Sequence, residues 1–339
     1  MFIIKWILKI VFKIVLAAAV LTGLIWLLFN WPVQSKNEDM DFGVSFAHHH
    51  AESLGLDWKE TYLEILDDLE TDKLRIAAYW DRIEKENGEY DFSDVDWQVE
   101  KARERGVDLV LAFGVKTPRW PECHIPEFYM NDKKEREEAL LEFEEVLLNR
   151  YKDYDNIAYW QVENEPFLPY FGDCPEGAVD ENLVDKEIDL VKSIDPDRPI
   201  IVTDSGELSI WYQAAKRADV FGTTLYRIIH KPPFGYVEYP LGPNFFRLKA
   251  KFIKYFAGQD DVIISELQAE PWPKAWILHV SVEEQYKTMD PEKFREIIEY
   301  AKKTNFDAAY LWGAEWWYWL KTKENKPEMW EEARKVLKE

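Results

Sequence analysis

Short apolar runs alternate with longer amphipathic stretches along most of the chain. Each run is almost continuously apolar, as expected for a parallel strand that is buried on both faces. The runs begin near Phe42, Lys73, Val107, Ile157, Pro199, Asp219, Val262 and Phe306. Stretches with helical periodicity lie at 58–69, 95–105, 134–151, 182–193, 245–256 and 291–303, and a last one ends the chain. Eight such alternations in about 300 residues predict an α/β fold, a (β/α)8 barrel of the TIM type.

An open, doubly wound sheet is the alternative arrangement of the same elements. That fold carries a glycine-rich turn after its first strand, where the phosphates of a dinucleotide bind. No such turn follows the run at Phe42, and no phosphate-binding loop occurs elsewhere in the sequence. We therefore favour the closed barrel and expect no cofactor.

The N-terminal segment differs from the rest of the chain. Its only charges are Lys5, Lys9 and Lys13, and residues 14–31 form an uncharged run long enough to span most of a bilayer. Lysines precede this run and acidic residues follow it from Glu38 onward, so we expect a cytoplasmic N-terminus and an exported remainder. The run ends in bulky residues, which fits a cleaved signal peptide poorly. The expected parts are a cytoplasmic stub and single transmembrane helix at 1–33, a linker at 34–40 and an extracytoplasmic barrel at 41–339.

Composition narrows the range of partners. The formal net charge of -22 would repel a phosphate backbone, so we expect no nucleic acid partner. The 16 Trp, 17 Tyr and 19 Phe are suited to stacking on sugars, although an aromatic core would also account for them. The two cysteines, Cys123 and Cys174, form either a disulfide or two unpaired thiols.

Polar residues gather where the predicted strands end, which is where barrel enzymes carry their chemistry. The fourth run ends in Asn164, Glu165 and Pro166, and the seventh ends in Glu266. This placement resembles glycoside hydrolase clan A, whose acid/base glutamate follows an Asn at the end of the fourth strand and whose second glutamate ends the seventh. The segment after the second run also looks like the corresponding segment of that clan, in residues Trp80, Ile83, Glu84, Gly88, Tyr90, Asp91, Phe92 and Asp96.

The resemblance implies a retaining glycoside hydrolase that acts on β-linked glycans of an oligo- or polysaccharide. Glu165 would protonate the leaving oxygen, and Glu266, about 5 to 5.5 Å away, would attack the anomeric carbon. Burial and the nearby charge of Glu266 would raise the pKa of Glu165. Glu163, Glu270 and Glu315 are local competitors for these roles, and their positions match the motifs less well.

Further substrate contacts follow from the same resemblance. Asn164 would bind the sugar 2-hydroxyl, Arg75 and Tyr226 would hold the nucleophile ionised and oriented, and Trp312 would form a sugar platform. Additional candidates near the strand ends, expected to contact substrate, are Trp80, Trp120, Trp272, His48 and Glu315. Core packing is the alternative interpretation for the aromatic members of this set.

The sequence also departs from the clan. Several clan families carry a His at the end of the third strand and another two residues before the sixth-strand Tyr, where this chain has Phe113, Gly114, Val115 and Thr224. The sequence therefore does not determine which glycan is the substrate. A non-catalytic glycan-binding barrel and a transglycosylase are alternative functions. Consecutive residues rarely converge on one ion, so the run His48, His49, His50 does not predict a metal site.

Overall fold

The computed structural model describes residues 2–338 and contains eight parallel strands closed into a barrel, in the order β1-β12-β11-β8-β7-β6-β5-β2. The start of each predicted run lies within two residues of the start of an observed strand, and the closed sheet confirms the (β/α)8 barrel. The barrel strands are β1 (Asp41–Ser45), β2 (Lys73–Ala77), β5 (Asp108–Phe113), β6 (Ile157–Val162), β7 (Ile200–Asp204), β8 (Val220–Leu225), β11 (Val262–Gln268) and β12 (Ala308–Trp312).

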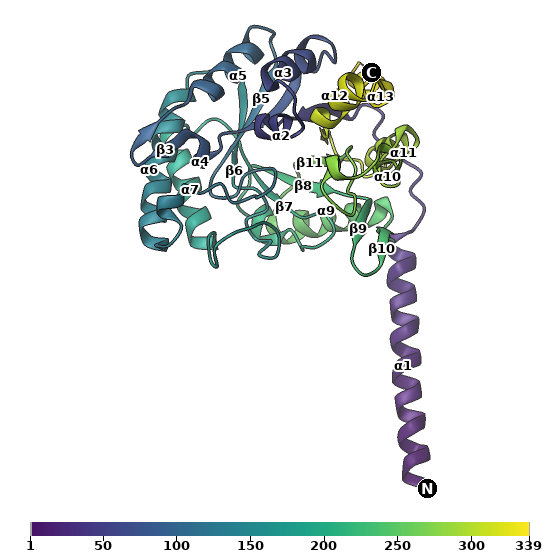
Figure 1. Ribbon diagram of the computed structural model, residues 1–339. Coiled ribbons are helices and arrows are strands. Elements are labelled where there is room, and N and C mark those ends of the chain that lie inside the picture. Colours follow the sequence, from purple (N-terminus) through teal and green to yellow (C-terminus); the bar gives the residue numbers. More distant parts are fainter. Residues whose placement is uncertain (1, 339) are drawn as a thin grey trace.

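Helices form a ring around the barrel, which Figure 1 shows approximately along its axis. The longer ones are α3 (Trp58–Asp67), α5 (Ser93–Arg103), α6 (Lys133–Tyr151), α7 (Glu181–Ile194), α9 (Pro243–Ala257), α11 (Pro291–Lys302), α12 (Ala314–Lys323) and α13 (Glu328–Leu337). Shorter helices are α2 (His48–Ser53), α4 (Trp80–Ile83), α8 (Tyr212–Ala215) and α10 (Val282–Gln285). Four helices begin after an Asp whose carboxylate accepts the first free backbone N–H groups, at Asp57, Asp132, Asp180 and Asp290.

Two small antiparallel hairpins interrupt the alternation. One joins β3 (Glu84–Glu86) to β4 (Glu89–Tyr90), and the other joins β9 (Ile228–Lys231) to β10 (Gly235–Glu238). The second follows the C-terminal end of β8, so it lies at the rim of the barrel where candidate site residues gather. The sequence pattern does not predict either hairpin, because such short strands carry too little periodicity to separate them from loops.

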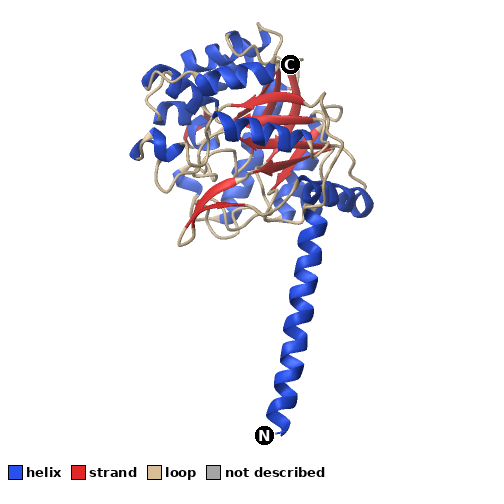
Figure 2. Cartoon of the chain, turned by 90° about the vertical axis from the view of Figure 1, so that its right-hand side faces the viewer, coloured by secondary structure: helices blue, strands red, loops and turns tan. Residues whose placement is uncertain are grey.

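The N-terminal helix α1 (Phe2–Phe29) extends away from the barrel as a single rod (Figures 1 and 2). Its segment Lys5–Phe29 is 25 residues long, contains an 18-residue stretch with a mean hydropathy of 2.4 and is long and apolar enough to cross a membrane. The end of the rod packs on α9, where the rings of Phe29 and Phe245 lie 5.0 Å apart and Asn244 Nδ2 donates to the Leu28 carbonyl at 2.8 Å. Asn37 then donates to the Phe306 carbonyl at 3.0 Å, so the following segment lies against the barrel.

A disulfide joins the loops that follow β5 and β6. It links Cys123 to Cys174 across a sequence separation of 51 residues. Of the two possibilities that the sequence left open, the structure forms the bond. The linked loops flank the ends of two strands that carry candidate site residues, so the bond restrains that part of the rim.

Candidate active site

The end of β6 has an unusual backbone. Glu163 and Glu165 have φ angles of 59° and 46°, in the left-handed region that non-glycine residues rarely adopt. Contacts hold this turn in place, because Asn164 N donates to the Lys116 carbonyl at 2.7 Å and Glu165 N donates to Thr203 Oγ1 at 2.9 Å. Strained positions of this kind concentrate at functional sites. The turn points the two glutamates in different directions.

Glu165 is buried, and its carboxyl group has one direct hydrogen-bond donor, Thr224 Oγ1, at 3.1 Å from Oε1. Its pKa is raised well above the ordinary value, first by burial and then by the negative charges of Glu266 and Glu122. A carboxyl group in this environment retains its proton to a higher pH than an exposed one. Glu165 is therefore suited to give a proton to a bound molecule.

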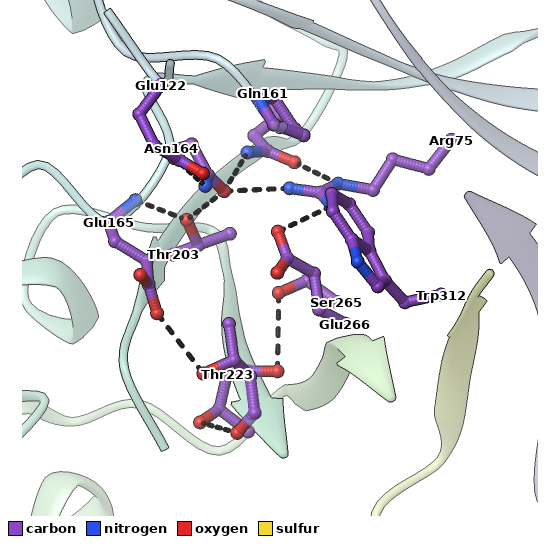
Figure 3. A network of polar contacts seen from close by, with 12 residues as sticks. Arg75, Glu122, Gln161, Asn164, Glu165, Thr203, Thr223, Ser265, Glu266 and Trp312 are labelled. Atoms are coloured by element: carbon purple, nitrogen blue, oxygen red, sulfur yellow. Dashed lines mark hydrogen bonds and ion pairs between the residues drawn. The ribbon is translucent and has the colours of Figure 1, made fainter. Parts of the chain in front are cut away.

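Glu266 lies on β11 at a point where the strand is irregular. The register with β8 shifts between Ile264 and Glu266, so Ser265 is an extra residue there. Such a bulge re-aims the following side chain. Arg75 Nη1 donates to Glu266 Oε1 at 3.0 Å and the Tyr226 hydroxyl donates to Oε2 at 3.0 Å, so each oxygen has its own donor. Figure 3 shows the carboxyl groups of Glu165 and Glu266 projecting from opposite sides toward the same region.

Arg75 connects the two halves of the site. Besides Glu266, its guanidinium donates to Asn164 Oδ1 at 2.9 Å and to Gln161 Oε1 at 2.8 Å (Figure 3). Asn164 Nδ2 in turn donates to Glu122 Oε2 at 3.0 Å, which fixes the orientation of the amide. Burial and the charge of Glu266 raise the pKa of Glu122 to about 7. The network thus holds a buried cation among several carboxyl and amide groups.

A second cluster adjoins this network. Arg119 forms ion pairs with Glu270 and with Glu315, the latter at 3.1 Å, and its guanidinium lies 4.1 Å from the centre of the Trp312 ring. Trp312 Nε1 donates to Glu270 Oε1 at 3.0 Å, and Glu315 Oε1 accepts from Ala47 N at 2.6 Å. Both glutamates are therefore paired with a guanidinium, whereas the Glu165 carboxyl group accepts from the neutral hydroxyl of Thr224.

A family profile places the chain among known proteins. The profile described as "Cellulase (glycosyl hydrolase family 5)" matches residues 39–225, more than half of the chain. The chain belongs to glycosyl hydrolase family 5. The matched range includes Glu165 and ends with β8, before Glu266. No curated protein sequence matched this family 5 chain.

Solved glycosidases share the fold of this family 5 protein. A β-galactosidase from Halorubrum lacusprofundi is 16% identical with a TM-score of 0.58, covering 88% of this chain and 58% of that one. The exo-β-1,4-mannosidase Op5Man5 from Opitutaceae bacterium strain TAV5 is 15% identical with a TM-score of 0.56, covering 80% and 51%. GH5_18 from Bifidobacterium longum is 15% identical with a TM-score of 0.57, covering 81% and 70%. The chain thus spans between half and three fifths of the length of the first two, and at these identities the likeness concerns the fold.

The expected site residues fall into groups in the family 5 barrel. The structure brings five of them into one network: Arg75, Asn164, Glu165, Tyr226 and Glu266. Trp312 and Glu315 belong to the neighbouring Arg119 cluster. The ring of Trp272 lies edge-on to that of Tyr226, with the ring centres 5.4 Å apart. Trp120 is 64% exposed on the loop after β5.

Two expected substrate contacts lie outside the site. Trp80 is completely buried, donates from Nε1 to Glu84 at 2.6 Å and stacks on Tyr129, so no sugar can reach its faces. His48 is buried against Trp58, with ring centres 5.4 Å apart. Helices α4 and α2 begin soon after their strands end, and both side chains pack between the barrel and its helices.

Glu163, a competitor for the catalytic roles, points away from Glu165. Its two oxygens accept from Val115 N at 2.8 Å and Lys116 N at 2.6 Å. Gly114 makes this possible, since it has a φ of 129° and a Cβ there would lie 2.6 Å from Glu163 Cδ. Where several clan families carry a His at the end of the third strand, this chain has a glycine in close contact with a buried glutamate. At the sixth-strand position, Thr224 supplies a hydroxyl to Glu165 instead of an imidazole.

Sequence reasoning assigned no individual role to several residues that complete the site. These are Glu122, Arg119, Gln161, Thr203 and Lys116, whose Nζ donates to the Glu165 carbonyl at 3.0 Å. Gln161 could have been found by strand alternation, because it lies on β6 and is buried in the barrel beside Arg75. Glu122 and Arg119 carried no such signal, since they lie in a loop whose path the sequence pattern does not define.

Proposed function

We propose that the protein is a retaining β-glycosidase in which Glu165 is the general acid/base and Glu266 the nucleophile. The observation that carries this proposal is the difference between the two environments. Glu266 receives a hydrogen bond from a guanidinium and another from a phenol, so its carboxylate lies in an ion pair with Arg75. Glu165 is buried beside that negative charge, which favours the protonated form. Double displacement requires a carboxylate that can attack and a second carboxyl group that holds a proton, and Glu266 beside Arg75 and the buried Glu165 fit these two roles.

In the first step, Glu266 Oε attacks the anomeric carbon while Glu165 gives its proton to the leaving glycosidic oxygen. The bond to the leaving group breaks as the glycosyl-enzyme ester forms. Asn164 has one amide hydrogen left after binding Glu122, and in this proposal that hydrogen binds the sugar 2-hydroxyl. Arg75 keeps both Glu266 and Asn164 in position, so the nucleophile and the sugar contact are aligned together.

In the second step, water replaces the glycosyl ester. Esterification removes the negative charge of Glu266, so one cause of the raised pKa of Glu165 disappears. Glu165, now ionised, takes a proton from water as the oxygen attacks the anomeric carbon, and Glu266 leaves as a carboxylate. Two inversions leave the anomeric configuration unchanged. An acceptor sugar in place of water would give transglycosylation by the same chemistry.

Trapping with a 2-fluoro glycoside that has an activated leaving group tests the assignment. The label is expected on the peptide that contains Glu266, and Glu266→Gln is expected to abolish both labelling and turnover while the protein remains folded. A label on Glu270 or Glu163, or turnover by Glu266→Gln, would overturn the assignment of the two glutamates. A substrate for these assays should be sought on a panel of aryl glycosides. Because the fold neighbours include a β-galactosidase and a β-mannosidase, that panel should begin with β-galactosides, β-mannosides and β-glucosides.

We also propose that α1 is an uncleaved anchor that holds the barrel on the extracytoplasmic side of a membrane. The supporting features are the lysines at its N-terminal end, the apolar segment Lys5–Phe29 and the contacts that join its end to α9. N-terminal sequencing of the mature protein from membranes should return the start of the chain. A mature protein that begins after residue 29 would show that the segment is a signal peptide instead.

A further inference from the structure

Helix α9 differs in charge from the other helices of the barrel. Its sequence contains Arg247, Lys249, Lys251 and Lys254 and no acidic residue, although the whole chain has a net charge of -22. Two of these cations are used internally, because Arg247 donates to the Lys303 carbonyl and Lys249 lies over the Trp211 ring. Lys251 and Lys254 are exposed, with Lys254 paired to Asp260 at 2.8 Å.

The same helix exposes large aromatic side chains. Tyr255 is 82% exposed, Phe256 59% and Phe252 39%, while Ile253 is fully buried against the barrel. We call Lys251, Phe252, Lys254, Tyr255 and Phe256 the α9 face. Several large aromatic side chains exposed together beside lysines are unusual for a surface that meets only water, because the exposed rings are costly there. They are typical of a helix that lies in the interface of a bilayer.

The position of α1 indicates what covers this face. In Figure 1, α1 leaves the lower side of the barrel, and α9 is the ring helix on that side. Phe29, the last residue of α1, contacts Phe245 in the first turn of α9, so the apolar rod ends where α9 begins. A membrane crossed by α1 would therefore lie directly beneath α9. The β9–β10 hairpin lies on the same side, and Phe234 in its turn is 76% exposed.

We propose that the α9 face binds the surface of the bilayer that α1 spans, with its aromatic rings at the headgroup level and its lysines drawn to anionic lipids. This inference rests on the proposed anchor and goes beyond the proposed glycosidase activity. Anionic lipids attract basic residues near the surface, which offsets the repulsion that a strongly acidic protein would otherwise meet there. The contact would give the barrel a fixed orientation instead of leaving it on a flexible tether.

The orientation has a consequence for the site. The barrel axis runs across the direction of α1, as the two views in Figures 1 and 2 show together. With the α9 face on the membrane, the strand ends that carry Glu165 and Glu266 would open along the membrane surface and not away from it. The protein would then act on glycans held close to the bilayer.

The test uses the full chain in vesicles of equimolar phosphatidylcholine and phosphatidylglycerol. The two native cysteines are joined in a disulfide, so Tyr255→Cys introduces a single thiol for a nitroxide label. Compared with a label on a water-exposed surface, this label is expected to be more accessible to oxygen and several-fold less accessible to a water-soluble nickel chelate. Glu104→Cys on the opposite side of the ring is the matched control and should remain accessible to nickel. A label at Phe234→Cys should show the same high accessibility to oxygen and low accessibility to nickel as the label at position 255.

Two outcomes would overturn the proposal, and they differ in meaning. If a label at Leu16→Cys lies in lipid while the label at position 255 is as accessible to nickel as that at position 104, the anchor stands and the α9 contact is wrong. If the label at position 16 is also accessible to nickel, both fail. Glycoside hydrolysis by the same samples is a separate readout, so the proposed function can survive either result. Replacing Lys251 and Lys254 with Glu should reduce immersion at position 255, and undiminished immersion would overturn the role of the lysines.

Discussion

Replacing Tyr226 with Phe tests how the nucleophile is held. The change removes one hydroxyl, which donates to Glu266 Oε2 at 3.0 Å, and keeps the ring. Burial and the charge of Glu266 raise the pKa of Tyr226, so the phenol is a neutral donor throughout the working pH range. A hydrogen bond to a charged group contributes roughly 1.5–3 kcal/mol, which corresponds to a loss of about 10- to 150-fold in kcat/KM if it is made in the transition state.

The measurement is kcat/KM on the best aryl glycoside of the panel, together with Tm for each variant. Tyr129→Phe is a matched control, because the Tyr129 hydroxyl also donates to a buried glutamate, Glu84, at 3.1 Å, but far from the site. The control should lose some stability and keep its activity, whereas Tyr226→Phe should lose activity. If kcat/KM of Tyr226→Phe stays within about twofold of the parent protein, the hydroxyl does not orient the nucleophile and its proposed role is wrong.

Three further predictions address the acid/base, its pH range and the rim. Glu165→Ala should lower kcat/KM on substrates with poor leaving groups by roughly 10²- to 10⁴-fold, and equal losses on all leaving groups would contradict the role. With an activated leaving group, azide should restore turnover of this variant, because it attacks the glycosyl-enzyme without a general base and gives a glycosyl azide. The charge of Glu122 raises the pKa of Glu165, so Glu122→Gln should lower that pKa and move the alkaline limb of kcat/KM to lower pH; an unmoved limb would show that the two groups are not coupled. Opening the 51-residue loop with Cys123→Ser and Cys174→Ser should cost roughly 4 kcal/mol in the free energy of unfolding, measured by urea titration, and an unchanged midpoint would refute this.

The barrel could be predicted from the sequence because its strands are buried on both faces. Each strand is therefore an apolar run that stands out against the amphipathic helices, and the order of runs leaves few arrangements. The positions of Glu165 and Glu266 follow from the same count, since each glutamate comes directly after or at the end of a run. The bulge at Ser265 was not visible, because one extra residue in a strand does not alter an apolar pattern.

The rest of the site depends on loop paths. Arg119 and Glu122 lie in a loop where both have positive φ angles, of 90° and 73°, and only that backbone brings them to Glu315 and Asn164. Trp80 shows the opposite error. It follows a strand, as a substrate contact would, but α4 begins at this residue and turns the ring into the core. The sequence could therefore show which residues lie near a strand end, but only the structure shows whether their side chains point into the site or into the core.

The seam of the barrel determines when the fold can be completed. β1 pairs with β12 in a register that opposes Asp41 to Ala308, so the earliest strand to be synthesised must wait for the last. Until the final segment emerges, seven strands form an open sheet with two unpaired edges, an arrangement that invites pairing with other chains. In the folded protein the segment after α1 lies on the barrel beside this seam, with Asn37 bonded to the Phe306 carbonyl next to β12. A chain held by α1 during synthesis would therefore keep one side of the seam in place while the other side arrives, and truncation before β12 should yield aggregation instead of a smaller barrel.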